Sequence, residues 1–174
     1  MRRLMLLRHA KSDWSDRLTD FERPLAKRGE KAAPMMGAYM AAEHLVPDCA
    51  MVSPARRARD TWALVAPAFR ETVKHVTEPR LYEAEPEDIL AAVRRTKKGV
   101  KSLVVVGHNP GFEDLAVELI GHGDRYAFAR LKQKFPTAAL AVIDFAVNDW
   151  DEVKPHDGRL DRFVTPRMLG GDDD

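Results

Sequence analysis

Short apolar runs alternate with longer amphipathic segments along the chain. The apolar runs are rich in β-branched residues, which is typical of buried strands. They fall at residues 3–7, 50–53, 72–76, 102–106 and 138–145. The amphipathic segments predict helices at residues 26–44, 56–69, 87–96 and 112–120. This alternation predicts a three-layer α/β/α sandwich with a mainly parallel central sheet.

The chain shows no internal repeat and no low-complexity linker that would mark a domain boundary. With 174 residues it fits one domain. We therefore predict a single domain over residues 1–169. Residues 170–174, Gly-Gly-Asp-Asp-Asp, cannot bury a core and are predicted to form a disordered tail.

Charge and composition exclude several classes of protein. Lysine and arginine number 28 against 27 acidic residues, a net charge of +1, which argues against a nucleic-acid partner. The apolar segment Leu4 to Leu7 is shorter than the roughly 7 to 15 residues of a signal peptide. No run approaches the roughly 20 residues of a membrane span. We expect a cytoplasmic protein without a membrane partner; the oligomeric state is not indicated.

Arginine and histidine side chains follow the first apolar run. Leu6-Leu7 is succeeded by Arg8-His9, and a strand of an α/β protein delivers its last residues to the carboxyl edge of the sheet, where ligands bind. Arginine offers a fixed fork of donors to phosphate or carboxylate, and a neutral imidazole can act as a nucleophile. Arg8 and His9 are therefore candidate site residues.

The helix predicted after the second apolar run begins with several arginines. At about 100° per residue, Arg56 and Arg59 fall in one sector that is expected to face water, whereas Arg57 points elsewhere. Arg57 is thus the arginine of this helix that can turn toward a site. Anions favour the start of a helix because the first backbone N–H groups and the helix dipole point toward them.

The run at 102–106 stops at Gly107-His108. Taken alone, His108 fits a structural or capping histidine as well as a catalytic one. Because neighbouring parallel strands end at the same sheet edge, His108 is predicted to meet Arg8, His9 and Arg57 in one crevice. Two arginines and a histidine around a second histidine would bind a tetrahedral dianion and leave one imidazole free to attack phosphorus.

The ordered set of motifs resembles the signature of the histidine phosphatase superfamily. Its members here are Leu-Leu-Arg8-His9-Ala, Ser53-Pro54-Ala-Arg-Arg57-Ala and Val-Gly107-His108-Asn-Pro. The stretches at 8–14, 23–29 and 135–138 are similar to those of SixA-type phosphohistidine phosphatases. The resemblance covers roughly residues 1–145.

The resemblance implies a phosphoglycerate mutase-like fold and phosphoryl transfer in two steps. His9 would attack phosphorus and form a covalent phosphohistidine, which water then hydrolyses. Arg8, Arg57 and His108 would form the phosphate pocket, and neither a metal nor another cofactor is implied. The expected function is a metal-independent phosphatase that removes phosphate from phosphohistidine in a protein partner.

Two further positions depart from the family pattern. Ser15 stands where many relatives have a phosphate-binding Asn, and its hydroxyl is a candidate donor to phosphate. Glu83 stands about where larger relatives carry an acidic proton donor, with Glu85 as the alternative. Glutamates close to a helix start are also favoured there by the helix dipole.

Two arguments favour phosphohistidine as the substrate. A weak acid suits the P–N bond, because imidazole leaves more readily than an alkoxide. The segments between Arg57 and Glu83 and between Glu83 and His108 are too short for a large lid. The pocket is therefore predicted to be open enough for a phosphohistidine on a protein surface.

Two alternatives remain at this point. One is a broad-specificity phosphatase of small phosphomonoesters, and the other is a non-catalytic phosphate-recognition module. The remaining histidines lie on different predicted elements without the paired short spacing of metal ligands, so no metal site is predicted. They are His44, His75, His122 and His156.

Overall fold

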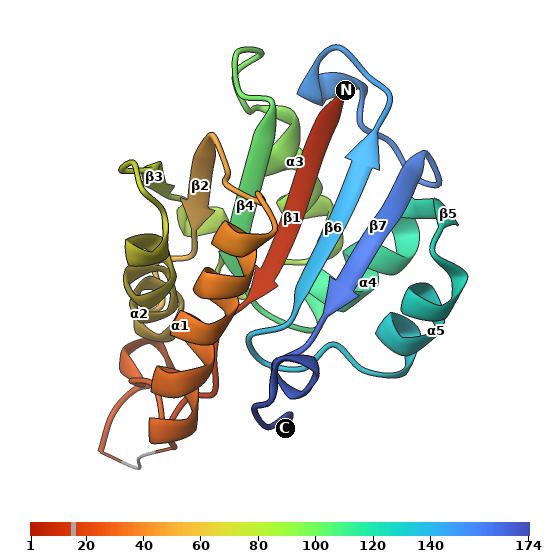
Figure 1. Ribbon diagram of the computed structural model, residues 1–174. Helices are drawn as coiled ribbons and strands as arrows, with labels where there is room; N and C mark the ends of the chain where they lie inside the picture. Colours follow the sequence, from red (N-terminus) through yellow and green to blue (C-terminus); the bar gives the residue numbers. More distant parts are fainter. Residues whose placement is uncertain (15–16) are drawn as a thin grey trace.

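A seven-stranded sheet forms the middle layer of the protein, with the strand order β3-β2-β4-β1-β6-β7-β5 (Figure 1). The structure is a computed structural model that describes residues 1–14 and 17–174. The strands are β1 (Arg2–Arg8), β2 (Cys49–Val52), β3 (Lys74–Thr77), β4 (Ser102–Gly107), β5 (Ile120–Gly123), β6 (Leu140–Phe145) and β7 (Gly158–Val164). Strand β6 runs antiparallel to its neighbours β1 and β7, and the other pairs are parallel. The predicted mainly parallel sheet is confirmed.

Helices cover both faces of the sheet (Figure 1). They are α1 (Lys27–Ala42), α2 (Arg56–Val65), α3 (Pro86–Arg94), α4 (Gly111–Leu119) and α5 (Arg125–Gln133). One apolar cluster joins the sheet to α1 and α2, and a second joins it to α3, α4 and α5. The three-layer sandwich is thereby confirmed. Within residues 1–14 and 17–174, no helix combines the length and apolar character needed to cross a membrane.

Strand β1 is the apolar centre of the sandwich. Its side chains alternate between the two clusters, with Leu4 and Leu6 in the α3–α5 layer and Met5 and Leu7 in the α1–α2 layer. All four are fully buried. Burying each such side chain contributes about 1.5–3 kcal/mol, so the strand that ends at Arg8 is held firmly on both faces.

Three elements are absent from the sequence prediction: β5, α5 and β7. The sequence of β7 is Gly-Arg-Leu-Asp-Arg-Phe-Val, in which charged residues interrupt the apolar alternation. Strand β5 reads Ile-Gly-His-Gly and is typical of a helix stop rather than a strand. The other predicted strands and helices are present, with their ends shifted by a few residues.

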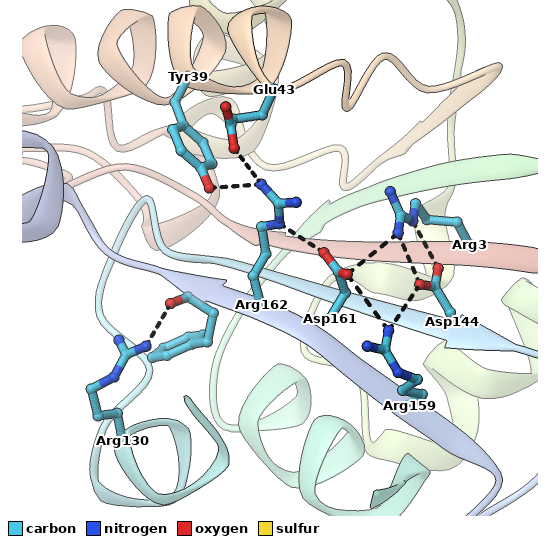
Figure 2. A network of polar contacts seen from close by, with 9 residues as sticks. Arg3, Tyr39, Glu43, Arg130, Asp144, Arg159, Asp161 and Arg162 are labelled. Carbon is cyan, nitrogen blue, oxygen red and sulfur yellow. Dashed lines mark hydrogen bonds and ion pairs between the residues drawn. The ribbon is translucent and has the colours of Figure 1, made fainter. Parts of the chain in front are cut away.

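The charged residues of β7 belong to a polar network on the sheet (Figure 2). Arg3 of β1 donates to both carboxylate oxygens of Asp144 of β6, at 2.7 and 2.8 Å. Arg162 of β7 donates to the Tyr39 hydroxyl of α1 at 3.0 Å and to Glu43, the C-cap residue of α1, at 2.8 Å. Ion pairs thus join the sheet to α1 where apolar side chains would otherwise be expected.

Residues 170–174 make defined contacts in the structure, although the sequence predicts a disordered tail. Gly170 turns the chain with a left-handed backbone (φ 92°) after the 3-10 helix Pro166–Leu169. Asp173 then accepts a hydrogen bond from the Arg167 N–H at 2.8 Å. The boundary of the domain at residue 169 stays a prediction.

Replacing Asp144 with Asn is expected to destabilise the fold. The Asp144 side chain is 7% exposed, and the substitution would leave the partly buried Arg3 guanidinium with only the longer ion pair to Asp161 at 3.8 Å. We expect the free energy of unfolding to fall by about 1–3 kcal/mol, measured by urea denaturation. Asp157→Asn is the control, because its ion pair with Lys154 is exposed and should change stability by less than about 0.5 kcal/mol. Equal effects of the two substitutions would contradict the prediction.

Candidate active site

Three neighbouring strands deliver the candidate residues to one edge of the sheet. In the order β2-β4-β1, the strands are hydrogen-bonded in parallel. The His9 N–H donates to the Gly107 carbonyl at 3.0 Å, and the Ser53 N–H donates to the Val106 carbonyl at 3.0 Å. His9, Ser53 and His108 therefore leave their strands side by side, as the sequence predicts for the two histidines.

His9 is 6% exposed and its imidazole is held in one orientation. Its Nδ1 lies 2.8 Å from the Ala10 carbonyl oxygen. Because a carbonyl can only accept, Nδ1 carries the proton and Nε2 keeps a free lone pair. Burial lowers the pKa of His9 well below 6.5, the Ala10 hydrogen bond opposes this, and the charges of Arg8 and Arg57 lower it further. His9 is thus a neutral imidazole with Nε2 available as a nucleophile.

His108 lies next to His9, with 5.2 Å between the ring centroids. Its Nε2 is 2.7 Å from the Ser53 hydroxyl oxygen, which also accepts the Ala55 N–H at 3.3 Å. Burial and then the charge of Arg57 lower the pKa of His108 to about 4. In the neutral ring, a Ser53 hydroxyl that donates to Nε2 leaves the proton on Nδ1. His108 can then donate to an anion without carrying a charge itself.

Arg57 turns inward from the first turn of α2, whereas Arg59 on the same helix is exposed. Arg57 Nη1 donates to the Asp20 backbone carbonyl at 2.8 Å, and Nη2 donates to the Asp20 carboxylate at 3.2 Å. Thr61 links this helix to the nucleophile: it donates to the Arg57 carbonyl and accepts the Ala10 N–H at 2.9 Å. The inward orientation that the helical spacing predicts for Arg57 is present in the structure.

Arg8 is positioned by the loop that precedes β6. Its Nη1 donates to the Phe135 carbonyl at 2.8 Å, and the Asn109 amide donates to the same carbonyl at 3.0 Å. The Ala138 N–H lies 3.1 Å from the carbonyl oxygens of Arg8 and His9. This loop therefore holds both the backbone and the side chain at the end of β1.

Three buried nitrogens of this cluster have no hydrogen-bond partner in the described part of the chain. They are Arg8 Nε, Arg57 Nε and His108 Nδ1. Nearly all buried polar atoms of folded proteins are paired, with protein, water or a ligand. These three nitrogens can all donate hydrogen bonds, and they surround the neutral His9. The arrangement indicates a binding site for an anion with several oxygen atoms.

The loop before α1 adds a carboxylate that the sequence analysis missed. Asp20, in the 3-10 helix Asp20–Glu22, accepts hydrogen bonds from Arg57, from Arg23 at 3.1 Å and from the Tyr82 hydroxyl at 2.6 Å. Burial works to raise the pKa of Asp20, but the contacts with Tyr82 and Arg57 outweigh it, so the pKa lies below its usual value. The Tyr82 ring in turn contacts His108 edge-on, with 5.8 Å between centroids.

The structure does not join Glu83 to the cluster by any direct polar contact among the described residues. Glu83 is exposed and adopts a left-handed backbone (φ 54°). It follows Tyr82, whose pKa is raised to about 12 by burial, by the Asp20 hydrogen bond and by nearby negative charge that includes Glu83. Glu85 is the N-cap residue of α3. Ser15 lies outside the described residues, so its predicted contact with phosphate stays a prediction.

Comparison with known proteins decides the family. The family model "Histidine phosphatase superfamily (branch 1)" matches residues 4–89. Uncharacterized protein Rv1276c of Mycobacterium tuberculosis is 36% identical over 167 residues, which cover 92% of this chain and 100% of that protein. The crystal structure of the proposed phosphohistidine phosphatase SixA from Agrobacterium tumefaciens is 31% identical, covers 95% of this chain and 98% of that chain, and has a TM-score of 0.80. The chain belongs to the histidine phosphatase superfamily.

Membership of the histidine phosphatase superfamily confirms the resemblance and makes the protein a phosphatase. A second structure, of the proposed SixA from Nakamurella multipartitia, is 25% identical with a TM-score of 0.83, and the match covers 95% of this chain and 96% of that chain. The phosphoglycerate mutase-like fold is therefore confirmed over nearly the whole length. The catalytic roles of individual residues remain predictions.

The protein is expected to lose stability as the pH falls from 6.5 toward 4. Between pH 6.5 and pH 4, His108 takes up a proton in the unfolded chain. It stays neutral in the folded protein, where its pKa is lowered to about 4, so protonation favours the unfolded state. Between about pH 7.5 and about pH 5 this contribution to the free energy of unfolding falls by about 1–2 kcal/mol. Urea denaturation at both pH values measures the difference.

The His108→Asn variant should show a smaller pH-dependent loss than the wild type, because the titrating ring is gone. His75→Asn, which removes an exposed imidazole on β3, is the matched control and should leave the loss unchanged. The same loss in the wild type and in His108→Asn would refute the assignment of a half-buried neutral ring.

Proposed function

We propose that the protein is a phosphohistidine phosphatase in which His9 takes the phosphoryl group from a phosphohistidine of a partner protein. The observation that carries the proposal is the set of unpaired buried nitrogens beside the free Nε2 of His9. The likeness to the proposed SixA phosphohistidine phosphatase of Agrobacterium tumefaciens, at 31% identity, supports this substrate class.

The reaction would proceed in two balanced steps. The Nε2 lone pair of His9 forms a bond to phosphorus while the P–N bond of the substrate breaks, and the departing imidazole takes up a proton from solvent or from Glu83, the candidate donor. A water oxygen then attacks the phosphoryl group on His9 and gives up its proton to solvent or to Glu83. The P–Nε2 bond breaks, the pair of electrons returns to Nε2, and inorganic phosphate leaves. The fixed Nδ1–H to Ala10 bond keeps Nε2 pointed outward in both steps.

Arg8, Arg57 and His108 would stabilise the charge that develops on the phosphoryl oxygens. Preorganised donors in a water-poor site are the main source of such stabilisation. Two guanidinium groups supply the positive charge that other phosphoryl-transfer enzymes take from metal ions. We therefore propose a metal-independent reaction, which predicts activity that resists a chelator.

The available acids favour a substrate with an easily released group. Asp20 is hydrogen-bonded to Arg57, but its pKa is lowered, so it is ionised near neutral pH and cannot act as the proton donor. We assign Asp20 as a positioning residue for Arg57 and retain Glu83 as the candidate proton donor. Since Glu83 makes no polar contact with the site among residues 1–14 and 17–174, a leaving group that needs little protonation fits best.

The rim of the site is open to solvent. The Asp20 side chain is 46% exposed, and Trp14, which stacks on Arg23 at 3.6 Å, is 76% exposed. A residue on the surface of another protein could approach His9 between such groups. This exposure favours a protein substrate over a small metabolite, which would need an enclosing wall to be gripped.

Arg57→Ala is expected to reduce kcat/KM by some hundreds-fold, because removing one preorganised charge at a phosphoryl transition state costs about 3–4 kcal/mol. Arg59→Ala is the matched control: Arg59 lies on the same helix, is exposed and donates to the Pro54 carbonyl. It should retain kcat/KM within about twofold. Wild-type kcat/KM in Arg57→Ala would remove Arg57 from the pocket.

The deciding experiment offers the protein a phosphohistidine-bearing protein and, separately, para-nitrophenyl phosphate, with and without a chelator. We expect chelator-resistant loss of phosphohistidine that His9→Ala abolishes, with an acid-labile phosphoenzyme trapped only in the wild type. Preference for the ester would instead indicate a general phosphatase of small phosphomonoesters. Binding without turnover would indicate a phosphate-recognition module.

Glu83→Gln is expected to reduce ester hydrolysis more than phosphohistidine hydrolysis. An alkoxide leaving group needs a proton donor, and protonation of this kind contributes about 10²-fold or more, whereas imidazole departs with less help. The ratio of kcat/KM values for the two substrates, compared between wild type and variant, measures this. An equal loss on both substrates would contradict the role of Glu83.

A further inference from the structure

A carboxylate of the chain itself lies at the edge of the phosphoryl pocket. Asp174 Oδ2 is 3.9 Å from Arg8 Nη1 and 3.9 Å from Lys11 Nζ. Asp174 Oδ1 accepts a hydrogen bond from the Thr137 N–H at 3.0 Å. Two cations and a backbone donor thus surround one anionic group, whose side chain is only 15% exposed.

The three donors stand on rigid parts of the structure. Thr137 belongs to the loop whose Phe135 carbonyl holds Arg8 at 2.8 Å. The backbone of Lys11 is packed against Gly29 of α1, where an added Cβ would lie 2.1 Å from the Lys11 carbonyl oxygen. The three donors to the carboxylate therefore belong to the sheet and its adjoining loops, and not to residues 170–174, which supply the carboxylate.

The Asp174 carboxylate is held by weak contacts, although its three donors are fixed by the fold. Only one hydrogen bond, from Thr137, joins Asp174 to the three donors, and both ion pairs are at the outer limit of contact. A partly exposed ion pair contributes about 0.2–1 kcal/mol. A carboxylate tethered to a bound phosphoryl group has a high effective concentration at this place and can replace Asp174.

We propose that Arg8, Lys11 and the Thr137 N–H form an anion subsite that binds a carboxylate next to the phosphohistidine of the partner protein, with Asp174 as its internal occupant. The inference rests on the proposed function and specifies its substrate as phosphohistidine in an acidic sequence context. Asp174 competes with that carboxylate, and its negative charge also weakens the binding of a phosphoryl group through Arg8.

Two phosphohistidine peptides that differ only in an Asp or an Asn beside the phosphohistidine test the subsite. For the wild type, the KM of the Asp peptide should be about two- to fivefold below that of the Asn peptide. Asp174→Asn should lower the KM of the Asp peptide further with kcat unchanged, and Lys11→Met should abolish the preference. Equal KM values for both peptides in the Asp174→Asn enzyme would overturn the proposal.

The matched control is Asp172→Asn, which removes one negative charge from the same segment. Asp172 makes no polar contact with the described residues, so this variant should behave as the wild type. Calorimetry with inorganic phosphate gives a readout independent of turnover. Asp174→Asn should lower the Kd of phosphate about two- to fivefold, and Asp172→Asn should not.

The two proposals can fail separately. If Asp174→Asn lowers the Kd of phosphate while neither peptide is hydrolysed, the competition between Asp174 and a bound anion stands and the phosphohistidine phosphatase assignment fails. If the peptides are hydrolysed but Asp174→Asn and Asp172→Asn have equal effects on KM and Kd, the phosphatase assignment stands and the subsite fails.

Discussion

The pairing of β1 between β4 and β6 is the constraint on which the site depends. Hydrogen bonds hold both edges of β1, and its side chains are buried on both faces, so the point at which Arg8 and His9 leave the sheet is fixed. Arg8 stands opposite Gly107 in the parallel register with β4. A slip by one residue would turn His9 to the other face of the sheet and separate it from His108.

Charge balance is the second constraint, because guanidinium groups are costly to bury without partners. In the resting protein Asp20 pairs with Arg57, and Asp174 lies near Arg8. Each carboxylate lies near the terminal nitrogens of one arginine, and the Nε of that arginine has no hydrogen-bond partner among the described residues. In the proposed reaction, a phosphoryl group would therefore compete with these internal anions for both arginines.

The features that the sequence predicts are those encoded by local patterns. Apolar runs that end abruptly in Arg8-His9 and Gly107-His108 define strand ends, and helical spacing alone turns Arg57 inward. Strand β7 escapes prediction because its charged side chains are paired with residues distant in sequence. Arg162, for example, contacts Glu43, the C-cap residue of α1.

Asp20 and Asp174 escape prediction for a related reason. Both lie outside the regular helices and strands, and no periodicity marks their side chains as parts of a site. Their meaning comes only from the tertiary structure, which places one against Arg57 and the other against Arg8.

The electrostatics of the site bear on which bond it can break. Neutral His9 and His108 leave the arginines as the source of positive charge, and Arg57 helps to keep the pKa of Asp20 low. An ionised Asp20 cannot donate the proton that an alkoxide requires on leaving. A phosphorylated imidazole needs less help from a proton donor, because its nitrogen is a far weaker base than an alkoxide. In the proposed reaction, the charges that bind the phosphoryl group would thus also select against ester leaving groups.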